Sequence, residues 1–224
     1  MKSKILILVI SLSLVFVYGP RADAGFQDWL KDAARKLGGE KGLSEDEIVN
    51  GLKQALEIGT GNAVQTVSQT NGYFKNPQIR IPLPENVKKA EKLLRATGFG
   101  SQVDKFELSM NRAAERAAPE AKAIFWDAIK QMSFADGRQI LDGPDDAATR
   151  YFQEKTASRM QKVFKPITHQ AMSEVGVTRN YQSIDDKIKT IPYADRMSFD
   201  LDQYVTDKAL SGLYLMLAEE EKKI

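Results

Sequence analysis

The sequence contains no cysteine and a single histidine, His169. Without cysteine the fold cannot use disulfides, and the chain lacks the residue that anchors bacterial lipoproteins. Zinc sites built on cysteine and Cys–His nucleophile pairs are excluded as well. Neither G-x-S-x-G nor S-x-x-K occurs, so the usual serine nucleophiles lack their local motifs. We therefore assign no catalytic residue, no metal site and no cofactor, and we expect His169 to be a solvated or core-edge side chain.

Long hydrophobic runs are also missing. The longest, Ile5 to Tyr18, is shorter than the roughly 20 residues that a membrane-spanning helix needs. It follows two lysines and precedes Gly19-Pro20 and an A-x-A motif at 22–24. These features predict a secretory signal peptide over residues 1–24, cleaved after Ala24, and therefore an exported, periplasmic protein. An uncleaved N-terminal anchor is the alternative.

The chain has little excess charge of either sign, with a formal net charge of +2. Lys2, Lys4, Arg21 and Asp23 of the signal peptide account for that excess, so the mature chain is formally neutral. A neutral chain gives no electrostatic reason to expect a nucleic-acid partner. Its length is sufficient for one well-formed core without metals or disulfides.

Residues 25–43 read as an amphipathic N-terminal helix followed by a glycine linker. Apolar side chains recur at helical spacing on one face: Phe26, Trp29, Leu30, Ala33 and Leu37. This helix either docks on its own domain or makes a weak membrane-surface contact through Phe26, Trp29 and Leu30.

Helical periodicity dominates the remainder, residues 44–224. Ser44 with Glu47 forms a capping-box pattern, Ser133 with Asp136 marks another helix start, and Asp200 begins a final helix that we expect to be central and buried. Pro119 and Pro166 interrupt long apolar stripes and predict kinks. We predict an all-α, single-domain helical bundle with kinked long helices.

One stretch, residues 71–84, does not fit a helix because it contains three prolines. Ile79, Ile81 and Leu83 alternate with Gln78 and Arg80, which predicts an extended Pro-rich strap with the aliphatic side chains against the bundle. The strap either covers a groove between helices or places Tyr73, Phe74 and Arg80 at the mouth of a pocket.

Polar residues inside an apolar stripe form the second feature of interest. Arg112 and Glu115 are spaced for an i,i+3 ion pair, either solvated on the outer face or with Asn111 or Arg112 directed inward. A buried arginine would need an internal carboxylate or an anionic ligand. The candidate ligand-binding residues are therefore Tyr73, Phe74, Arg80, Asn111, Arg112 and Glu115.

A further acidic group is spaced unlike a calcium loop, and we expect helix capping rather than metal binding from it. Its members are Asp136, Asp142, Asp145 and Asp146.

Several blocks occur together in order: "GYFKN", "IRIPLP", "NRAAE", "IFWDAI" and "YVTDKALSGLYLMLAEEEKKI". Over residues 44–224 the chain resembles an exported bacterial family catalogued as domain of unknown function four-one-nine-seven. The resemblance implies a helical envelope protein and supplies no known activity.

The function is not readable from these features. The hypothesis we favour is a non-enzymatic periplasmic binding or envelope-interaction protein, whose partner is an unknown small molecule or envelope protein. The alternative is a hydrolase-type enzyme with paired carboxylates and an arginine anchor. A cavity holding two carboxylates and Arg112 would favour the enzyme.

Overall fold

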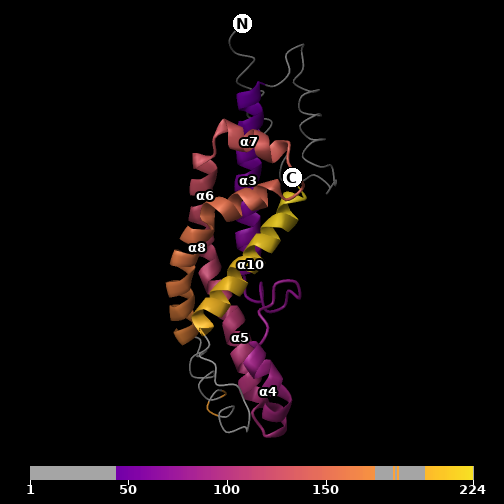
Figure 1. Ribbon diagram of the computed structural model, residues 1–224, viewed down its shortest axis with the longest axis vertical. Coiled ribbons are helices and arrows are strands. Elements are labelled where there is room, and N and C mark those ends of the chain that lie inside the picture. Colours follow the sequence, from indigo (N-terminus) through magenta and orange to yellow (C-terminus); the bar gives the residue numbers. More distant parts are fainter. Residues whose placement is uncertain (1–43, 175–183, 185, 187–199, 224) are drawn as a thin grey trace, which may run out of the picture.

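The computed structural model describes residues 44–174, Ile184, Asp186 and 200–223 (Figure 1). The elements in this part of the chain are helical: α3 (Glu45–Ser68), α4 (Glu85–Ala96), α5 (Gly100–Ala117), the 3₁₀ turn η2 (Ala118–Glu120), α6 (Ala121–Gln131), α7 (Phe134–Leu141), α8 (Ala147–Glu174) and α10 (Leu201–Glu221). The prediction of an all-α helical bundle is confirmed. None of these helices is long and apolar enough to cross a membrane.

The bundle is elongated, with α3, α5, α6, α8 and α10 forming its body (Figure 1). α8 packs against α10, α5 and α6, while α3 packs against α10 and α6. α7 lies across α3 toward one end, and α4 lies at the opposite end, where it packs against α5. Within the described residues the two ends therefore differ: α7 crosses α3 toward one end, and α4 and α5 form a helical hairpin at the other.

The predicted helix starts are built as the sequence indicated. Ser44 and Glu47 form a capping box at α3, and Ser133 and Asp136 form another at α7. The Asp200 carboxylate accepts a hydrogen bond from the Gln203 amide at the start of α10. Each cap satisfies an amide that the helix cannot pair internally, and each places negative charge at the positive end of the helix dipole.

The N-terminus of α8 is capped from a distant part of the chain. The Glu221 carboxylate accepts hydrogen bonds from the Ala148 amide at 2.6 Å and from the Thr149 amide at 2.9 Å. It also accepts one from the Thr149 hydroxyl at 2.6 Å. The last turn of α10 is thereby fixed to the first turn of α8, which makes these two helices antiparallel neighbours.

The two interrupting prolines act differently. Pro119 lies in the 3₁₀ turn that separates α5 from α6, so the long apolar stripe is divided there, as its missing amide hydrogen requires. Pro166 lies inside α8, and the helix continues through it to Glu174.

The core is a single apolar cluster with aromatic rings at its centre. Phe125 contacts Phe152 edge-to-face at 5.2 Å between ring centroids, and Tyr214 at 6.1 Å. α10 contributes Val205, Leu213 and other side chains to this core but is not buried all round. Asp207, Ser211 and Leu215 form an exposed stripe on α10, so this helix packs against α8, α3 and α5 but is not buried on every side as predicted.

The α3–α4 connection, residues 69–84, differs from the extended strap that we predicted. Its first part is a series of turns, in which the amides of Gly72, Lys75 and Asn76 bond to carbonyls three or four residues earlier. Residues 80–84 follow without turns. The predicted burial nevertheless holds, because Ile79, Ile81 and Leu83 are 5%, 0% and 7% exposed. The segment is thus a folded connection with its aliphatic side chains in the core.

Other predictions fall outside the described residues. These are the signal peptide with cleavage after Ala24 and the amphipathic segment 25–43 with Phe26, Trp29 and Leu30.

Candidate functional site

The α3–α4 connection begins with two residues of restricted choice. Asn71 has a φ of 72°, in the left-handed region that asparagine tolerates better than most residues. A Cβ on Gly72 would lie 2.5 Å from the Thr66 carbonyl oxygen and 2.6 Å from that of Val67. Only glycine fits so close to the end of α3, so this turn brings the chain directly back over the bundle.

Glu115 on α5 anchors the next two residues. Its side chain is 4% exposed, and its Oε1 accepts hydrogen bonds from the amides of Tyr73 at 3.1 Å and Phe74 at 3.2 Å. Its Oε2 lies 2.5 Å from Arg112 Nη1. Arg112 also donates to the Asn71 Oδ1 at 2.9 Å. A buried carboxylate is therefore satisfied by one guanidinium and two backbone amides, as burial of a charge requires.

Asn111, fully buried, holds the later part of the connection. Its Oδ1 accepts from the Ile81 amide at 2.8 Å, and its Nδ2 donates to the Ile81 carbonyl at 2.9 Å and to the Glu107 carbonyl at 2.8 Å. A single amide side chain thus replaces both partners that a neighbouring strand would give Ile81. The inward alternative for Asn111 is the one the structure shows.

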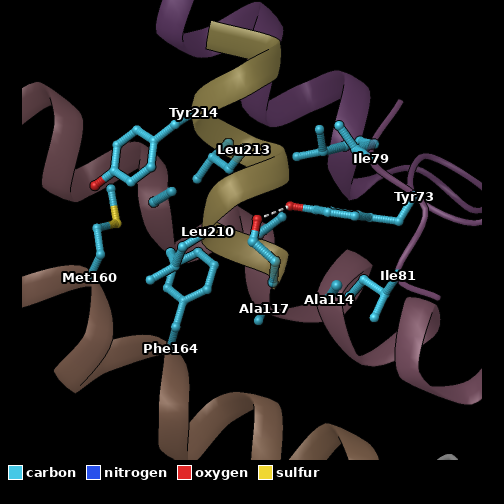
Figure 2. Packing of buried hydrophobic residues seen from close by; sticks show 14 of the residues in the cluster. Tyr73, Ile79, Ile81, Ala114, Ala117, Met160, Phe164, Leu210, Leu213 and Tyr214 are labelled. Carbon is cyan, nitrogen blue, oxygen red and sulfur yellow. Dashed lines mark hydrogen bonds between the residues drawn. The ribbon is translucent and has the colours of Figure 1, made fainter. Parts of the chain in front are cut away.

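Tyr73 fills the space between the connection and α10. Figure 2 shows its ring beside Ile79, with the hydroxyl directed at α10, where it donates to the Ala209 carbonyl at 2.6 Å. Burial, with a smaller contribution from the Glu115 charge, raises the pKa of Tyr73. A Cβ on Gly212 would lie 2.8 Å from the Tyr73 ring and 3.0 Å from the Ile79 Cβ. Gly212 therefore lets α10 approach the connection.

Arg80 and Phe74 lie on the outer side of the same region. The Arg80 guanidinium is 4.5 Å from the centroid of the Phe74 ring and makes two hydrogen bonds to Glu107, at 3.0 and 2.7 Å. The pair is partly solvated, because the Arg80 side chain is 42% exposed. Arg80 faces outward as predicted, but its ion pair was not anticipated.

All six candidate residues therefore meet where the α3–α4 connection contacts α5. Four of them, Tyr73, Asn111, Arg112 and Glu115, satisfy one another or the backbone. Asn71 and Glu107, which sequence reasoning missed, complete the cluster. Asn71-Gly72 is a turn dipeptide, and Glu107 lies one turn before Asn111, so both signals were present in the sequence.

Phe74 is the candidate residue that lines a surface depression. It lines a shallow depression of about 490 Å³ between the connection, α4 and α5. The other lining residues are Arg95, Gly100, Ser101, Asp104, Lys105 and Leu108. Arg95 is paired with Asp104 at 2.8 Å and with Glu91 at 2.9 Å. Lys105 therefore leaves the lining with a positive charge beside two apolar side chains.

A cavity of about 450 Å³ between α7 and α8 brings carboxylates together, with Asp136, Asp142 and Glu154 among its lining residues. The Asp136 Oδ2 accepts from the Ser133 hydroxyl at 2.6 Å and amide at 2.9 Å, and these two bonds lower the Asp136 pKa. A general acid needs the opposite shift. Asp136 is thus a capping residue, in line with the prediction for the acidic group.

A third hollow, about 630 Å³, runs along α8 and α10 and includes Leu210, Tyr214 and Leu215. Elsewhere, His169 Nδ1 lies 2.7 Å from the Asp202 Oδ2, with 63% of the histidine side chain exposed. In the described part of the chain, no group of three or more histidine or acidic residues is placed to hold a metal ion.

Comparison with known proteins identifies a protein family but no individual relative. No curated protein and no solved structure matches the chain. A family model described as protein of unknown function (DUF4197) matches residues 42–224, which is most of the chain. The chain therefore belongs to this family of unknown function, DUF4197.

Proposed function

We propose that this protein is an exported, non-enzymatic binding protein of the cell envelope, and that it binds a ligand in the depression beside Phe74. The observation that carries the proposal is that the six candidate residues have different roles. Four are committed to holding the α3–α4 connection on α5, whereas Phe74 lines an open hollow. Export is proposed from the basic, apolar and A-x-A features of residues 1–24.

The lining indicates the class of ligand. Phe74 and Leu108 offer apolar contact, Ser101 offers a hydroxyl, and Lys105 offers a positive charge. A small amphipathic anion would match this combination, because an apolar part would cover the ring while a carboxylate or phosphate faced the ammonium group.

The hydrolase alternative has less support. It requires Arg112 as a substrate anchor near free carboxylates, whereas Arg112 is paired with the buried Glu115 and with Asn71. The carboxylate-lined cavity beside α7 uses Asp136 as a helix cap.

The test is to purify the protein from its native envelope and to identify co-purifying small molecules by mass spectrometry. We expect one class of amphipathic anion with the natural protein and its loss from Phe74→Ala. Phe134→Ala is the matched control, because Phe134 is also a partly exposed phenylalanine, 38% accessible, but lies on α7. Retention of the same molecule by Phe74→Ala would contradict the proposal.

A further inference from the structure

α4 presents one whole face to solvent. Its apolar side chains Val87 and Leu94 are fully buried, and α5 is the helix against which it packs. Figure 1 shows α4 at one end of the described bundle, beside α5.

The outward face is basic with an apolar centre. Positions i, i+3, i+4, i+7, i+8 and i+11 of a helix share one side. Starting from the first residue of α4, these are Glu85, Lys88, Lys89, Lys92, Leu93 and Ala96, and all six are exposed. Leu93 is 46% exposed and lies one turn after Lys89 on this face.

These lysines differ from the arginines of the described part of the chain. Every arginine in the described ranges is in an ion pair, among them Arg95 on α4 itself, which takes up Glu91. Within the same ranges, Lys88, Lys89 and Lys92 make no salt bridge. α4 contains four basic residues against two acidic ones, so the face keeps an uncompensated positive charge.

We infer that this face of α4 docks on the surface of an anionic phospholipid bilayer. The inference rests on the proposed location in the envelope, but it does not depend on the depression beside Phe74. Flexible lysine side chains suit phosphate headgroups as point charges, and Leu93 can enter the boundary between headgroups and acyl chains. A soluble polyanion would gain nothing from Leu93.

The size of the effect follows from the charge. Each lysine near an anionic surface increases partitioning roughly fivefold, so three should contribute about a hundredfold. The attraction is screened beyond a Debye length of about 8 Å at physiological salt. Binding should therefore be reversible and should weaken steeply as salt is added.

The experiment measures co-flotation of the mature protein with phosphatidylglycerol-containing vesicles and with neutral phosphatidylcholine vesicles. We expect binding to the anionic vesicles and a drop of about a hundredfold in the triple variant Lys88→Gln, Lys89→Gln, Lys92→Gln. The matched control replaces the exposed Lys122, Lys130 and Lys162 of α6 and α8 by glutamine, with the same change in net charge. It should lose at most a few-fold.

Leu93→Ser separates a bilayer from a soluble polyanion. We expect it to weaken vesicle binding and to leave binding to heparin unchanged. Equal losses in the two triple variants, or no binding of the natural protein to anionic vesicles, would overturn the inference. So would unchanged vesicle binding by Leu93→Ser, which would assign the face to an acidic macromolecule. Because these side chains are exposed, we expect unchanged thermal melts for every variant. The triple α4 variant should also retain the co-purified small molecule, so loss of vesicle binding can be told apart from loss of the proposed ligand binding.

Discussion

At the scale of single residues, buried polar groups decide how the α3–α4 connection is held. Asn111 supplies both a donor and an acceptor to Ile81, and Glu115 accepts from two consecutive amides. A backbone segment without a neighbouring strand or helix must find such partners if it is buried. Two side chains on α5 provide them.

The first prediction concerns Asn111→Ala. The substitution leaves the amide and the carbonyl of Ile81 buried without their partners, and each unsatisfied group costs about 1–3 kcal/mol. We expect a loss of about 2–4 kcal/mol in the free energy of unfolding, measured by denaturant melts. Gln78→Ala is the control, because Gln78 is exposed on the same connection and should change stability by less than about 0.5 kcal/mol. Similar, small effects of both substitutions would contradict this role for Asn111.

At the scale of elements, the connection depends on close approach to α10. Tyr73 and Ile79 occupy the space that a side chain at position 212 would need. The contact joins residues more than a hundred positions apart in sequence, as the Tyr73–Ala209 hydrogen bond with a separation of 136 illustrates. Such a contact fixes the connection to α10 as well as to α5.

The second prediction compares two glycines in helices. Gly212→Ala places a methyl group 2.8 Å from the Tyr73 ring, and overpacking of this kind costs about 1–3 kcal/mol. At Gly61 of α3 the added methyl group would meet nothing within 4 Å. Gly61→Ala should therefore stabilise the protein by about 0.5–1 kcal/mol through helix propensity alone. Thermal or urea melts that show two stabilising substitutions would contradict the close approach.

The elements differ in how far the sequence reveals them. Helix starts were predictable because a capping box is a local pattern of two side chains, and Ser44 and Ser133 both use it. The backbone of the connection was not, because the alternation of Ile79 and Ile81 outweighed the turn signal of Asn76-Pro77. The Asn76 carbonyl in fact accepts from the amides of Ile79 and Arg80.

The candidate site could be predicted only in part, because the sequence shows the local spacing of its residues but not their burial. An i,i+3 pair such as Arg112 and Glu115 has the same spacing on a solvated face and beside a buried segment. Whether the pair is solvated or buried depends on which segment of the chain packs against it, and local sequence spacing does not show that. That the six residues lie together, and that Glu115 is buried, came from the structure.

At the scale of the whole molecule, buried and partly buried tyrosine phenols link stability to pH. Burial raises the pKa of Tyr73, Tyr151, Tyr204 and Tyr214, and that of Tyr204 reaches about 12. In the unfolded chain these groups would titrate near the ordinary tyrosine value of about 10. Below that pH both states are protonated and stability is complete. As pH rises above it, the unfolded state loses protons first and stability falls.

The third prediction is therefore a decline in the free energy of unfolding at alkaline pH, steepest above about pH 10. Tyr73 alone contributes a slope of up to about 1.4 kcal/mol per pH unit. Urea melts across this range measure the slope, and Tyr73→Phe should reduce it. Ionisation of all tyrosines near their ordinary pKa in the folded protein, seen as phenolate absorbance without loss of helix, would contradict the burial.

The central claim is that the α3–α4 connection is a folded part of the bundle rather than a lid. Native-state hydrogen exchange tests it most directly, since the amides of Tyr73, Phe74 and Ile81 bond to side chains of α5. The account predicts that these three amides exchange only through global unfolding, with the same free energy as the core amides of α5. Exchange of all three at a free energy several kcal/mol lower than that of α5 would show a connection that opens by itself, and would contradict the claim.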